Sequence, residues 1–64
     1  MPIEKLLEAL MFNVQEHFNL SGEDALAAVA LSKVANELAE YGNVHNLTLE
    51  ELSEKLYKEI AMAE

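Results

Sequence analysis

Two histidines, His17 and His45, are the residues of this sequence best suited to metal binding or proton transfer. Metal sites on helices often pair a histidine with a glutamate three residues earlier, and zinc proteases use His-Glu-x-x-His. A valine and a glycine stand three residues before these histidines, and His-Glu-x-x-His does not occur. We expect His17 to be a partly buried structural residue at the edge of a helix core face, and His45 to lie in a solvated loop. The sequence therefore predicts no metal site.

The twelve acidic residues are numerous, but their spacing does not indicate catalysis. Glu4 and Glu8, and likewise Glu50 and Glu54, share helix faces that should be solvated. A general acid needs a pKa raised by burial or by a nearby like charge, and no pattern in the sequence predicts a pocket. Serine nucleophile elbows and glycine-rich phosphate loops do not occur, because the only two glycines lie at predicted helix ends. We expect no catalytic residues and no cofactor, so the protein is predicted not to be an enzyme.

The charge balance is strongly acidic. Twelve acidic residues face four lysines and no arginine, which gives a formal net charge of −8 at pH 7. Direct binding of DNA or RNA is disfavoured, because such proteins use cations to displace phosphate counterions and arginine to read base edges. No apolar run is long enough for a membrane span, and the N-terminus lacks the features of a secretory signal. The sequence predicts a cytoplasmic protein that binds neither nucleic acid nor a membrane.

The length of the chain, 64 residues, allows one small domain. A domain of this size hides only about 60% of the surface that its unfolded chain exposes, so its stability is marginal. Disulfides, metals or partner subunits usually supplement such small cores. Cysteine is absent, so we expect the domain to associate with itself or with another protein.

Two similar stretches, NLSGED at 19–24 and NLTLEE at 46–51, predict helix starts. In each, a hydroxyl can accept a hydrogen bond from the backbone N–H three residues on, while an acidic residue reaches back to the cap. Thr48 and Glu51 form the stronger pair; Asp24 is short, so its bond back to Ser21 is less secure. The similarity ends after the cap, which favours two separate helix starts over an internal duplication.

Hydrophobic periodicity predicts three helices, at about 2–18, 22–41 and 49–62. The expected core face of the first helix comprises Ile3, Leu6, Leu7, Leu10, Met11, Val14 and Phe18. That of the second comprises Ala27, Leu31, Val34, Leu38 and Tyr41, and that of the third Leu49, Leu52, Leu56 and Ile60. Short connections make sequence neighbours into neighbours in space. The predicted fold is all-α: a small three-helix bundle, built as a helical hairpin plus a third helix and completed by dimerisation.

Three large apolar residues fall outside these core faces. Phe12 points away from the core of the first helix, and Leu26 and Val29 project from the back of the second, where residues 25–31 read ALAAVAL. A helix that is apolar around most of its circumference should be covered on more than one side. We predict that Phe12, Leu26 and Val29 form a contact surface.

These patterns favour a small acidic, non-catalytic protein–protein interaction module: a regulator, inhibitor or assembly factor that forms a homodimer and binds another protein. One alternative is a nucleic-acid mimic, whose carboxylates would occupy the basic groove of a DNA- or RNA-binding protein with strong salt dependence. A second alternative is a structural subunit of a larger assembly, which would hold little stable structure alone.

Overall fold

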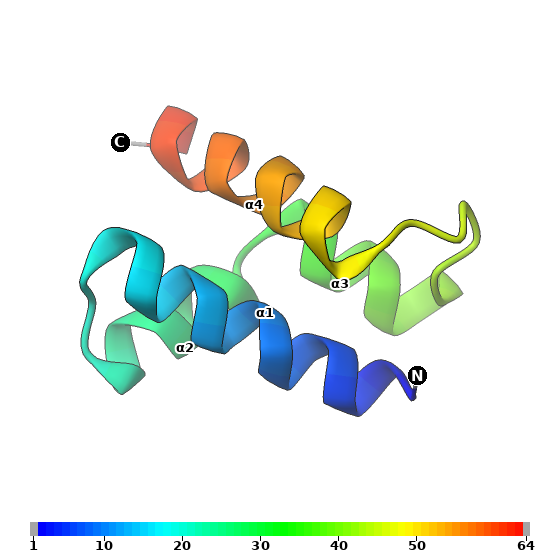
Figure 1. The fold of residues 1–64 in the computed structure, drawn as a ribbon, viewed down its shortest axis with the longest axis horizontal. Helices are drawn as coiled ribbons and strands as arrows, with labels where there is room; N and C mark the ends of the chain where they lie inside the picture. The colour runs from blue at the N-terminus through cyan, green and yellow to red at the C-terminus, as the bar shows by residue number, and fades with distance from the viewer. Residues whose placement is uncertain (1, 64) are drawn as a thin grey trace.

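The computed structural model describes residues 2–63, and this part of the chain is all-α. Its four helices are α1 (Ile3–Phe18), α2 (Gly22–Ala30), α3 (Lys33–Tyr41) and α4 (Leu49–Ala63). α1 packs chiefly against α2 and α4, and α3 lies against all three other helices. Figure 1 shows that α1 and α4 run in the same direction, so that the two ends of the chain lie at opposite corners of the view. Within residues 2–63, no helix is both long enough and apolar enough to cross a membrane.

The first helix follows its sequence pattern closely. Leu6, Leu10 and Val14 are buried, and the remaining residues of the predicted stripe pack around them half-buried. Pro2 is the N-cap and not the first helical residue; its carbonyl accepts a hydrogen bond from the N–H of Leu6 at 3.0 Å. The helix ends at Asn19, which adopts the left-handed conformation common at helix C-termini.

The predicted helix over 22–41 is wrong, because the chain breaks there into α2 and α3. Ser32 contributes to the break: its hydroxyl donates to the carbonyl of Val29 at 2.7 Å and accepts from the N–H of Ala35 at 3.1 Å. Serine can bond to nearby backbone in this way instead of continuing a helix. The fold is therefore a four-helix domain and not the predicted three-helix bundle.

A carboxylate from α4 completes the start of α3. Glu59 accepts hydrogen bonds from the N–H groups of Lys33 and Val34, the latter at 3.1 Å. The hydroxyl of Ser32 accepts from the next N–H, that of Ala35, and the N–H of Ser32 donates to the carbonyl of Val29. All four donors that a helix leaves unpaired at its N-terminus therefore find acceptors. The negative charge also suits the positive end of the helix dipole. Glu59 thereby fixes α3 to α4.

The break changes which residues reach the core. A straight helix would have buried Leu31 and Tyr41 on one stripe, whereas both are exposed, Leu31 to 85%. The buried residues of α2 are Ala25 and Val29, four apart, and those of α3 are Ala35 and Leu38. Each short helix has its own buried face, so the stripe predicted across both is wrong.

The last helix begins and packs as predicted. Thr48 N–H donates to Glu51 Oε1 at 3.0 Å and Glu51 N–H donates to Thr48 Oγ1 at 3.1 Å, which completes the capping box. The backbone N–H of Thr48, and then its hydroxyl, hold the pKa of Glu51 below its ordinary value of 4.5. At the start of α2, the hydroxyl of Ser21 accepts a hydrogen bond from the N–H of Asp24. Among the described residues, the side chain of Asp24 makes no hydrogen bond back to the N–H of Ser21. Leu52 and Leu56 are buried, with Leu49 and Ile60 packed beside them.

Candidate functional site

An apolar groove of about 460 Å³ lies between α1, α2 and α3. Its lining residues are Glu4, Leu7, Glu8, Met11, Leu26, Val29, Ala30, Ala35, Asn36 and Ala39. α1 contributes four of them, at spacings i, i+3, i+4 and i+7, which lie along one face of the helix. We call this hollow the apolar groove.

Small and flexible side chains make the wall of the groove. Val29 and Ala35 are buried at its base, and Leu26 stands 58% exposed at its side. Alanines leave room for another backbone to approach, while Met11 can adapt to different shapes because its side chain is unbranched and polarizable. The groove therefore presents apolar surface that the fold itself leaves uncovered.

The charged residues that line the groove are both acidic. Glu4 and Glu8 lie one turn apart on α1, and Glu8 also pairs with Lys5, Nζ to Oε2, at 3.9 Å. Both members of this pair are well exposed, so solvent screens it and it adds little stability. The solvent-facing edge of the groove is thus negative over an apolar base.

The structure places the three predicted contact residues differently. Phe12 and Leu26 are exposed, to 62% and 58%, as expected. Val29 is buried, so its predicted exposure is wrong; α2 ends at Ala30, and its buried stripe runs through Ala25 and Val29. Phe12 lies outside the groove on a neighbouring face of α1, and Glu8 borders both surfaces. The structure does not bring Phe12 and Leu26 into one site.

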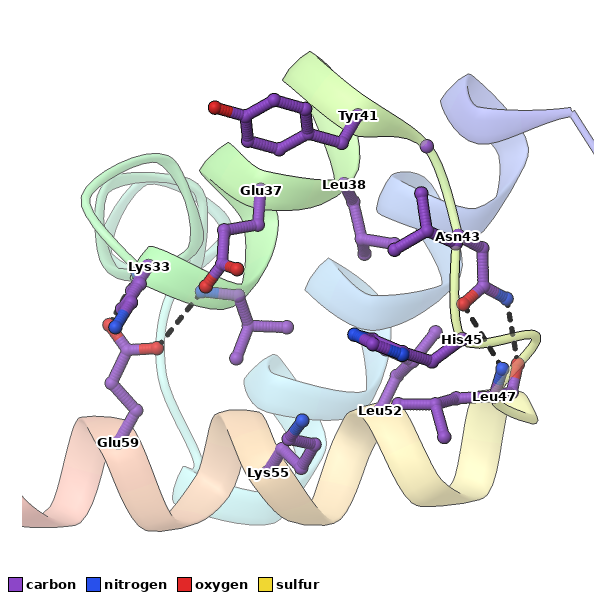
Figure 2. Close-up of a pocket in the computed structure, with 13 residues that line it drawn as sticks. Lys33, Glu37, Leu38, Tyr41, Asn43, His45, Leu47, Leu52, Lys55 and Glu59 are labelled. Atoms are coloured by element: carbon purple, nitrogen blue, oxygen red, sulfur yellow. Dashed lines mark hydrogen bonds between the residues drawn. The ribbon is translucent and has the colours of Figure 1, made fainter.

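A second hollow lies on the other side of α3. This polar pocket, of about 270 Å³, is lined by residues of α3, the loop over residues 42–48 and α4. Figure 2 shows that Glu59 reaches from α4 to the start of α3, and that Asn43 spans the loop to Leu47. Lys33 and Lys55 line it as well. The hydrogen bonds of Glu59 and Asn43 therefore stabilise the fold: they join α4 to α3 and close the loop.

His17 takes part in packing, and neither histidine belongs to a cluster of metal ligands within residues 2–63. His17 is exposed and not partly buried as expected, yet its ring stacks on that of Tyr57 with centroids 3.8 Å apart. Phe18 meets the same tyrosine edge-on at 5.9 Å, which joins the end of α1 to α4. His45 is exposed in the loop as predicted. Among residues 2–63, no three His, Cys, Asp or Glu side chains lie where they could hold a metal ion together.

Sequence reasoning assigned Leu7 and Met11 to the core face and so missed the groove. Both are half-buried, because α2 and α3 do not close over that edge of α1. The break at Ser32 positions Ala30 and Ala35 together at the groove. Only the break, which periodicity did not reveal, brings these residues to one place.

Comparison of the chain with protein-family models, curated proteins and solved structures finds no match. A fold by itself does not define a function, whereas the geometry and chemistry of a site can support one. The function is therefore inferred from the two hollows and their residues.

Proposed function

We propose that this protein is a small acidic, non-catalytic interaction module that binds another protein in the apolar groove. The observation that carries the proposal is the groove itself: an apolar base open to solvent, with Leu26 exposed at its side and charges only at its edge. Interfaces in general combine an apolar centre with a polar rim. Whether it acts as a regulator, an inhibitor or an assembly factor depends on the partner.

The exposed area of the molecule also supports association. The chain exposes 4647 Å², whereas a folded monomer of this mass typically exposes about 4,100 Å². Two protein partners usually bury about 800 Å² each on forming a stable complex. The exposed area above the typical value supports a partner that covers part of this surface.

A photo-crosslinking residue at position 26 tests the proposal. Placed in the protein in its source cells, it should form a defined adduct with a partner, while the same residue at position 31 should not, because Leu31 points to solvent away from the groove lining. The purified partner should then bind Leu26→Glu at least ~10-fold more weakly than wild type, since a charge would be buried against apolar surface.

Leu31→Glu is the matched control, because it makes the same change at a more exposed position. Its affinity for the partner should equal that of wild type. Equal binding by Leu26→Glu, or adducts that are the same from both positions, would contradict the proposal. An adduct between two copies of this chain would show that the groove serves self-association.

Homodimerisation is a separate prediction. Phe12 is a better candidate for a self-contact than the groove, because Lys5 and Glu8 beside it offer both signs of charge to a second copy. A two-fold interface pairs the same patch on each subunit. Sedimentation equilibrium should then show dimers that Phe12→Ala weakens without loss of helicity. A monomer at every concentration, with wild-type helicity, would exclude this prediction.

The two alternatives give different results in the same assays. A nucleic-acid mimic would bind its basic partner with strong salt dependence and would lose affinity on removal of acids well outside the groove. A structural subunit of a larger assembly would hold little helix in isolation. We favour the groove over mimicry because the exposed apolar side chain of Leu26 serves no purpose in a phosphate imitation.

A further inference from the structure

We infer that the partner presents a basic amphipathic helix, which lies in the apolar groove with an apolar stripe of two to three turns. This inference rests on the proposed function and specifies its partner. Three properties of the groove support it: the recognition modes that its residues allow, the spacing along α1, and the distribution of charge around it.

The groove suits a helix better than other peptide conformations. Addition of a strand needs an exposed sheet edge, and residues 2–63 contain no strand. Proline-rich segments dock in grooves lined by aromatic residues, and the residues lining this groove include none. Phosphorylated motifs are bound by arginine clusters, and the chain has no arginine. An amphipathic helix in an apolar groove is the remaining common mode.

The wall formed by α1 has the dimensions of a helix contact. From Glu4 to Met11 the lining residues span seven steps along α1, or about 10.5 Å at 1.5 Å per residue. A helix that lies along this wall meets it with apolar residues at i, i+3 or i+4, and i+7. Opposite α1, the exposed residues Ala30 and Ala39 have small side chains, so the axis of the bound helix can approach closely.

The charges around the groove favour a basic partner. Besides Glu4 and Glu8 in the lining, Glu23 lies one turn before Leu26 on α2, and Glu40 lies one turn after Asn36 on α3. Two of the four lysines, Lys33 and Lys55, line the polar pocket on the other side of α3, and Lys5 is paired with Glu8.

A second copy of this chain would bring its own acids against the same edge, which costs binding energy, whereas lysines or arginines beside an apolar stripe would complement it.

Synthetic peptides can test the partner's chemistry directly. The first peptide is a helix of about 18 residues, long enough to be partly helical alone, with leucines at i, i+3 or i+4, and i+7 and lysines beside them. The second has the same composition with the leucine positions scrambled, and the third replaces the lysines with glutamates. Fluorescence anisotropy with the full-length protein measures the three dissociation constants at 50 and 200 mM salt.

Two variants, each with a matched control, test whether the peptide binds in the apolar groove. Leu26→Glu changes the groove, and Leu31→Glu makes the same change outside it. The double variant Glu4→Gln/Glu8→Gln removes the acidic edge, and Glu50→Gln/Glu54→Gln removes a pair of the same spacing from α4. Glu4 and Glu50 each lie in the first turn of their helix, so the two double variants lose similar favourable interactions with the helix dipole.

The expected result is that the first peptide binds at least ~10-fold more tightly than the second and the third. Leu26→Glu and Glu4→Gln/Glu8→Gln should weaken binding of the first peptide. The two controls, Leu31→Glu and Glu50→Gln/Glu54→Gln, should leave its affinity unchanged.

If peptides one and three bind alike and Leu26→Glu weakens both, a basic partner is ruled out while the groove remains a docking site. If no peptide binds, or the scrambled peptide binds as well as the first, the helix inference is overturned. The crosslink from position 26 still decides the proposed function in either case.

Discussion

The apolar groove and the polar pocket lie on two sides of the same helix, and they differ in what their residues already do. α3 gives Ala35, Asn36 and Ala39 to the groove, and Val34, Glu37, Leu38 and Tyr41 to the pocket. In the pocket, Glu59 caps α3 and Asn43 closes the loop. At the groove, the exposed side chain of Leu26 completes no such contact.

This difference shows why the hollow with more polar groups is the weaker candidate for function. A fold of this size is stable only if nearly all backbone N–H and C=O groups at its helix ends have hydrogen-bond partners. Several of those helix ends lie at the pocket. Leaving Leu26 in water, by contrast, forfeits the stabilisation that burial would give. Residues that the fold does not require are the better guide to binding, and mutations on the two sides of α3 can test this distinction.

On the pocket side, the largest effect is expected from Glu59→Ala. It leaves the N–H groups of Lys33 and Val34 without their acceptor, and should lower the free energy of unfolding by about 1–2 kcal/mol. Glu37→Ala makes the same change in the same pocket, where the side chain of Glu37 makes no hydrogen bond to residues 2–63, and should stay within about 0.5 kcal/mol of wild type. Urea unfolding followed by circular dichroism measures both. Equal losses would mean that Glu59 does not hold α3 in place.

A smaller loss is expected from Asn43→Ala in the loop of the pocket. Its side-chain amide donates to the carbonyl of Leu47 at 2.8 Å, and its oxygen accepts from the N–H of Leu47 at 3.1 Å. Removal of both bonds should lower the free energy of unfolding by about 1 kcal/mol. Val44→Ala, at an exposed position in the same loop, is the control and should leave stability unchanged. If Val44→Ala destabilises as much, the loop packs through its apolar residue and not through Asn43.

The two outer helices were predictable because single periodic stripes determine them. Leu6, Leu10 and Val14 of α1, and Leu52 and Leu56 of α4, repeat at helical spacing and are buried as expected. Their ends were also predictable, since Asn19 and the Thr48–Glu51 pair act within a few residues of the helices they cap. Local chemistry was sufficient for these elements.

The middle of the chain was not predictable in the same way, because its break depends on a distant residue. Ser32 offers a cap from within the segment, but Glu59, which binds the next two N–H groups, lies 27 residues beyond it. Apart from Val29, residues 25–31 are alanines and leucines, which are good helix formers, so propensity favours continuation of the helix. The groove depends on this break, and therefore only its separate parts, Leu26 and the alanines, could be anticipated from sequence.

On the groove side of α3, Leu26→Ala should change the free energy of unfolding by less than about 0.5 kcal/mol. The side chain is 58% exposed, and alanine is the best helix former, so little buried surface and no helix propensity is lost. Val29→Ala, three residues along the same helix and buried, should lower it by about 1–3 kcal/mol. Comparable losses from the two would place Leu26 in the core and remove the basis for treating it as a binding residue.

The smallest effect concerns Glu51, whose cap on α4 is fully exposed to solvent. Hydrogen bonds from the N–H and hydroxyl of Thr48 lower the pKa of Glu51 from its ordinary value of 4.5. Near that pH the unfolded state therefore binds more protons, so the stabilisation by this carboxylate is present above pH 4.5 and is lost as pH falls through the lowered pKa. Glu51→Gln keeps a side-chain acceptor but does not titrate. The difference in free energy of unfolding between wild type and Glu51→Gln, measured from pH 7 to pH 3, should shrink on acidification, because the other carboxylates titrate equally in both proteins. A difference that stays constant across this range would show that the charge of Glu51 contributes nothing to the cap.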